Sequence, residues 1–141
     1  MSRESIVTEA DGFFAGTDAK MVYEIFKQGA PLDSDGVPTQ CEDVSAFAMK
    51  WSLRLATPVV PPYREQGTEV LTKATGSGIT VTGTYNLTRS VNTQRVEVAI
   101  ADTDTDALAG GNYVDALKRT DAGLESVLSY GTVKLLVAPA R

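Results

Sequence analysis

The segment Asp102-Thr103-Asp104-Thr105-Asp106 holds the residues whose types and spacing come closest to a chemical site in this chain. Alternating aspartates open the calcium loop of an EF-hand, where carboxylates supply the hard oxygen ligands that Ca²⁺ prefers. The rest of that loop does not follow, because Ala107 stands where a glycine is needed and Tyr113 where a bidentate glutamate is needed. The aspartates alone therefore predict no metal site.

The same segment has a structural interpretation that needs no ion. Asp104 or Thr105 would cap one short helical turn near residues 104–109, and Leu108 would hold that turn against the core. In immunoglobulin-like sandwiches a tyrosine near the start of a late strand bonds back to the corner just upstream. Leu108 and Tyr113 could form such a leucine-and-tyrosine pair, and the glycines between them allow a tight turn.

The remaining candidate groups form no catalytic set. The chain has one cysteine, Cys41, and no histidine. This excludes cysteine–histidine and serine–histidine–acid arrangements, most zinc sites and an internal disulfide. Four glutamates show no pairing suited to general acid and base work: Glu65, Glu69, Glu97 and Glu125. We interpret Cys41 as a buried or half-buried small apolar residue and predict no catalytic, metal-binding or cofactor-binding residue.

Two short motifs carry equally little chemistry. Asn86-Leu87-Thr88 matches a glycosylation sequon, but nothing in the sequence indicates secretion. Gly76-Ser77-Gly78 is not followed by the helix and lysine of a phosphate-binding loop, so we interpret it as a turn.

The composition indicates one soluble domain. The chain has 141 residues, 43% of them hydrophobic, and a formal net charge of −5. Its basic residues are spread along the chain, so we predict no direct contact with nucleic acid. No stretch is apolar enough to span a bilayer, and the N-terminus lacks the apolar core of a secretory signal. We expect synthesis and folding in the cytoplasm.

The elements that would position these residues are strands. From residue 47 to 55, large apolar residues alternate with small or charged ones, which is typical of a strand with one buried face. The large residues are Phe47, Met49, Trp51, Leu53 and Leu55. Trp51 is predicted to lie in the core. Similar alternation occurs at residues 19–26, 79–85 and 95–100, and residues 68–74 are also strand-like.

Seven to nine such strands, with no long helix between them, predict an all-β fold, namely an immunoglobulin-like antiparallel β-sandwich. We assign residues 13–141 to this domain and residues 1–12 to an N-terminal arm or weak first strand. The chain closes with a strand from about Gly110 to Arg119, a polar turn at residues 120–123, and two strand-like runs hinged at Gly131.

At these residues the chain resembles the small immunoglobulin-like domain that begins phage baseplate upper proteins and also forms short stand-alone phage structural proteins. The resemblance covers about residues 13 to 137. It rests on Gly16-Thr17-Asp18, Gly29-Ala30-Pro31-Leu32-Asp33, the strand from Phe47 to Leu55, the corner from Thr105 to Tyr113, and Tyr130-Gly131-Thr132-Val133. Residues 37–43 and 58–62 depart from the pattern, and we expect no further domain after the sandwich.

The resemblance implies a non-enzymatic phage virion structural protein, assembled in the host cytoplasm and present in many copies or as a homo-oligomer. We expect it to decorate or reinforce the capsid through contacts with the major capsid protein. An adaptor of the tail, neck or baseplate is one alternative, and a carbohydrate- or calcium-binding sandwich is another. The sequence does not identify partner-binding residues. The arm, the loop after Pro31 and the proline segment at 58–62 are the regions where we expect them.

Overall fold

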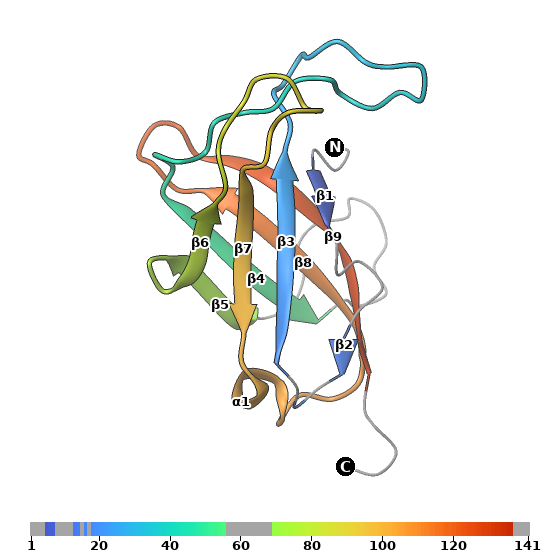
Figure 1. Cartoon of the computed structure of the whole chain (residues 1–141). Helices are drawn as coiled ribbons and strands as arrows, with labels where there is room; N and C mark the ends of the chain where they lie inside the picture. The colour runs from blue at the N-terminus through green and yellow to red at the C-terminus, as the bar shows by residue number, and fades with distance from the viewer. Residues whose placement is uncertain (1–4, 8–12, 15, 17, 56–68, 137–141) are drawn as a thin grey trace.

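The computed structural model describes residues 5–7, 13–14, 16, 18–55 and 69–136, which are almost entirely strands and their connecting loops (Figure 1). The elements are β1 (Ser5–Val7), β2 (Phe13–Phe14), β3 (Ala19–Ile25), β4 (Met49–Leu55), β5 (Glu69–Thr75), β6 (Gly78–Thr82), β7 (Arg95–Ile100), α1 (Asp102–Thr105), β8 (Gly111–Arg119) and β9 (Ser126–Leu136). Seven longer strands, β3 to β9, are flanked by the two short ones.

The strands form two packed layers. They are hydrogen-bonded in the order β1-β3-β7-β6-β5-β4-β8-β9-β2. Figure 1 shows β3, β7 and β6 lying across β4, β8 and β9. The two layers are linked between β5 and β6, which pair at only two positions. The order β1-β3-β7-β6 matches the ABED sheet of an immunoglobulin domain, and β4-β8-β9 matches its CFG sheet. The predicted immunoglobulin-like sandwich is confirmed.

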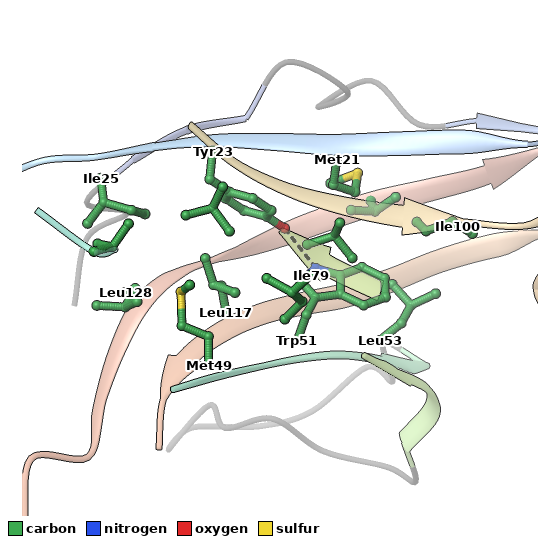
Figure 2. Close-up of a cluster of buried hydrophobic side chains, with 14 of the residues drawn as sticks. Met21, Tyr23, Ile25, Met49, Trp51, Leu53, Ile79, Ile100, Leu117 and Leu128 are labelled. Atoms are coloured by element: carbon green, nitrogen blue, oxygen red, sulfur yellow. Dashed lines mark hydrogen bonds between the residues drawn. The ribbon is translucent and has the colours of Figure 1, made fainter. Parts of the chain in front are cut away.

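The core lies between the two layers because alternate side chains of each strand point inward. Met21 and Tyr23 on β3 face Trp51 and Leu53 on β4, and Leu117 on β8 completes the centre (Figure 2). All five of these side chains have no exposed surface. The predicted burial of Trp51 is therefore confirmed, as is the burial of Cys41.

A tyrosine corner stabilises the segment that connects β7 in one layer to β8 in the other. The Tyr113 hydroxyl donates a hydrogen bond of 2.7 Å to the carbonyl oxygen of Ala109, four residues upstream. Leu108 packs against the core cluster. The helical turn α1 begins at Asp102 rather than near residue 104, because the Asp104 carboxylate accepts the amide of Ala101 and so caps an earlier turn.

Three details differ from the sequence prediction. The closing segment is one strand of 11 residues, β9, and not two runs hinged at Gly131. Gly131 pairs directly with Asp115, and the irregularity in the ladder lies instead between Leu117 and Lys118. Two pairings in the otherwise antiparallel order are parallel, β5 with β6 and β2 with β9. Phe47 lies just before β4 and not within it.

In the part of the chain that the structure describes, no helix has the length and apolarity needed to cross a membrane. The N-terminal arm is represented by β1, which pairs with β3. The proline segment at 58–62 lies outside the described residues.

Candidate functional site

The aspartates that resemble a calcium loop are engaged in local structure. The Asp104 carboxylate accepts the Ala101 amide at 2.7 Å and the Lys73 ammonium at 2.8 Å. The hydrogen bond from Lys73 lowers the pKa of Asp104 below its ordinary value. The hydroxyl of buried Thr105 accepts the Gly16 amide and ties α1 to the start of the chain. Among the described residues, no three potential metal ligands come together.

Two of the four glutamates, Glu69 and Glu97, are held apart in separate ion pairs. Glu69 contacts Lys50 and Arg54 at 3.1 Å each, on the outer side of β4 and β5. Glu97 pairs with Lys20 at 3.2 Å on the opposite sheet. Such an arrangement provides no pair of facing carboxylates for acid and base work. Of the other two glutamates considered, Glu125 lies in the β8–β9 turn and Glu65 outside the described residues.

Cys41 is poorly placed for nucleophilic chemistry. Its sulfur lies 3.8 Å from the Glu24 carboxylate and is fully buried. Burial, with the neighbouring Glu24 charge, raises the pKa of the thiol. A thiol that resists ionisation is a weak nucleophile, so Cys41 packs the base of a loop instead.

The most distinctive site is a set of loops gathered at one end of the sandwich, opposite α1 (Figure 1). We define the loop end as residues 26–48, 83–94 and 120–125, which connect β3 to β4, β6 to β7 and β8 to β9. Within the loop end, the sequence predicted a binding region only in the part after Pro31. The pairing with residues 83–94 has no local signal, because the partners are about fifty residues apart.

The first two loops pair through their backbones. The Cys41 amide donates to the Leu87 carbonyl at 2.8 Å, and the Arg89 amide donates to the Thr39 carbonyl at 3.0 Å. Within the first loop, Leu32 pairs with Pro38, so residues 32–38 form a small hairpin. These bonds turn two long connections into an ordered extension of the sheet.

Two buried polar side chains fasten the base of this extension. The Gln94 side-chain oxygen accepts the Val44 amide at 3.1 Å, while its nitrogen donates to the Asp43 carboxylate at 3.0 Å. The Asn92 side-chain oxygen accepts the Asn86 amide at 2.9 Å. Both Asn92 and Gln94 are buried. A buried amide side chain satisfies backbone groups that would otherwise lack partners inside an irregular loop.

The third loop is bonded to the first. The Thr120 amide donates to the Ala48 carbonyl at 2.8 Å, and the Ala48 amide donates to the Asp121 carboxylate at 3.1 Å. Arg119 binds Asp121 at 2.8 Å and lies over the Phe47 ring, 3.7 Å from its centroid. The cation–π contact and the ion pair together hold the β8–β9 turn against residues 26–48.

The loop end exposes aliphatic side chains. Six large hydrophobic residues are exposed in the described part of the chain, and four of them lie here: Leu32, Leu87, Val91 and Leu124. Leu32 is 63% exposed and Val91 59%. Single exposed apolar residues are common on proteins, but a concentration of them on a rigid surface is typical of a binding face.

Neither a scan against protein-family models nor a search of curated proteins finds a match to this chain.

Proposed function

We propose that this protein is a non-enzymatic structural component of a phage particle, which decorates or reinforces the capsid by binding other virion proteins. The observation that carries the proposal is the loop end, an ordered surface that presents aliphatic side chains outside a complete core. The residues on which the resemblance to the phage module rests support the placement of this protein in a virion. The carboxylates of Glu69, Glu97 and Asp104 are held in ion pairs, and the Cys41 thiol is buried. These groups are therefore poorly placed for catalysis, which favours a binding role.

The order of the loops bears directly on binding strength. Association loses free energy when flexible loops must be fixed in one conformation. At the loop end that cost has already been met during folding, because the three loops bond to one another and to buried Asn92 and Gln94. A preformed surface of standard size, roughly 1,600 Å² in total, is sufficient for stable attachment of each copy.

The test is co-sedimentation of the purified protein with purified empty shells, and separately with tails, of the phage that encodes it. Capsid decoration predicts saturable binding to shells, at a copy number fixed by shell symmetry. Binding to tails alone would reject the capsid placement and support an adaptor of the tail, neck or baseplate. Binding to neither assembly would reject the proposed function.

A further inference from the structure

The loop end also has an excess of acidic over basic residues. It contains two cationic side chains, Lys27 and Arg89, and six carboxylates. The carboxylates are those of Asp33, Asp35, Glu42, Asp43, Asp121 and Glu125. The loop end thus has a formal charge of −4, compared with −5 for the whole chain. Arg119, the last residue of β8, pairs with Asp121 at its margin.

Part of this charge is not neutralised within the molecule. Of the six carboxylates, Asp33 and Asp121 have arginine partners, although the Asp33–Arg89 distance is long at 3.8 Å. Asp35, Glu42 and Glu125 form no ion pair with any described residue. The hydrogen bonds that Asp33 and Asp43 accept hold their pKa values below the ordinary range, so both stay ionised near neutral pH.

On the basis of the proposed binding function, we infer that the loop end is the docking face and that its partner is a protein surface with lysine or arginine side chains around an apolar site. Leu32 and Val91, on two loops joined by the Asp33–Arg89 ion pair, would enter the apolar site. The uncommitted carboxylates would meet the cationic rim. Such complementarity accelerates encounter and excludes wrongly charged partners. A second copy of this chain fits poorly, because two loop ends facing each other would bring together like charges of −4.

The experiment uses a defined probe, a synthetic amphipathic helical peptide built of lysine and leucine. A peptide of the same design built of glutamate and leucine is the ligand control. We expect the protein to bind the lysine peptide at low salt, and about tenfold more weakly in a few hundred millimolar salt, because exposed charges are screened. The glutamate peptide should not bind.

Two variants with the same net charge locate the site. The test variant carries Asp35→Asn, Glu42→Gln and Glu125→Gln at the loop end. The control variant carries Asp18→Asn, Asp102→Asn and Asp106→Asn at the opposite end, beside α1. We expect a loss of about tenfold or more in affinity for the lysine peptide in the test variant and less than about twofold in the control. Equal losses in both variants, or no binding by the unmodified protein, would overturn the inference.

A second pair of variants tests the apolar contribution. Leu32→Ser with Val91→Ser removes exposed loop-end side chains, and Val70→Ser removes an exposed one from β5. The first change should weaken peptide binding several-fold, while the second should leave it unchanged. Unchanged binding in the first variant would reject the apolar half of the site. Thermal unfolding of each variant confirms that the fold is retained.

The particle experiment separates this inference from the proposed function. If the protein binds shells or tails and the loop-end variants bind equally well, the inference fails and the function stands. If no assembly binds any variant, the function fails and the peptide result decides the inference. Sedimentation of the free protein tests whether the partner is a second copy of this chain. Self-association that the loop-end variants abolish would identify a second copy as the partner and reject a basic protein surface.

Discussion

The Tyr23 hydroxyl joins the two layers of the sandwich at the centre of the core. It accepts a hydrogen bond of 2.7 Å from the Trp51 indole nitrogen, drawn as the dashed line in Figure 2. It also donates one of 2.8 Å to the Asp115 carboxylate. In antibody domains a tryptophan on the equivalent of β4 packs against a disulfide between the layers, and the second cysteine follows the corner tyrosine by two residues. Asp115 occupies that position relative to Tyr113, so hydrogen bonds link the layers where antibody domains use a disulfide.

Tyr23→Phe is therefore expected to destabilise the protein strongly. The change removes one oxygen atom but takes a hydrogen-bond partner from both the indole and a fully buried carboxylate, a loss of about 2–5 kcal/mol. Tyr130→Phe is the matched control, because Tyr130 is half-buried on β9 and should change stability by about 0.5 kcal/mol or less. Urea unfolding followed by Trp51 fluorescence measures both. Equal stability of the two variants would contradict a structural role for the network.

At the scale of elements, the loop between β6 and β7 depends on a close backbone approach at its first residue. Gly83 has a φ of 78°, and a Cβ atom there would lie 2.0 Å from the Thr93 carbonyl oxygen. Gly36, in the small hairpin of the loop end, has the same φ of 78° but open space around it. A comparison of alanine substitutions at these two glycines separates the destabilisation caused by backbone conformation from that caused by a steric clash.

We expect Gly36→Ala to cost about 1 kcal/mol, since the left-handed conformation is strained for any residue with a side chain. Gly83→Ala should cost about 1–3 kcal/mol more, because the loop must also move away from Thr93. Chemical denaturation of the two variants gives the difference. A cost at Gly83 no greater than that at Gly36 would show that the loop adapts freely.

The strands were predictable because each carries a local signal. Alternation of apolar residues located β3, β4 and β7 to within one or two residues, and the corner at Tyr113 followed from its spacing to Leu108. The hinge predicted at Gly131 was wrong because a glycine inside a strand need not interrupt it. Gly131 pairs with Asp115 within the ladder, and alternation continues through buried Val133.

The loop end was only partly predictable, for a physical reason. Leu87 and Val91 look like weak core residues in the sequence, because apolar type alone does not indicate exposure. Their position depends on backbone bonds between residues 39–41 and 87–89, which no local pattern encodes. The charge of the loop end follows directly from the sequence, but only the fold shows that its three segments lie together.

At the scale of the whole molecule, stability should be insensitive to mild acid and should fall in strong acid. Asp33, Asp43, Asp104 and Asp121 all have a pKa below the ordinary value of 3.8, because each accepts hydrogen bonds in the folded state. A carboxyl group whose pKa is lower in the folded than in the unfolded state stabilises the fold at pH values above its unfolded pKa. This stabilisation is lost as the pH falls through the folded pKa.

The urea midpoint should therefore stay nearly constant from about pH 7 to about pH 5 and decrease below about pH 4. In a variant with Asp43→Asn and Asp121→Asn, which keeps acceptor oxygens but removes two titrating groups, the acid decrease should be smaller. A midpoint that rises between about pH 5 and pH 3 would contradict this assignment. It would indicate that relief of repulsion among the loop-end carboxylates outweighs the hydrogen bonds.

The bond between Tyr23 and Asp115 also has a consequence for the timing of folding. It joins residues 92 positions apart, and the bond from Gly16 to Thr105 spans 89. Contacts this distant cost loop-closure entropy before they stabilise anything, and β-sandwiches rich in them fold in milliseconds to seconds. A chain emerging from the ribosome cannot form the Tyr23–Asp115 link until most of β8 has been made. Completion of the core therefore waits for the synthesis of β8, and the strands made earlier lack their full set of core contacts until then.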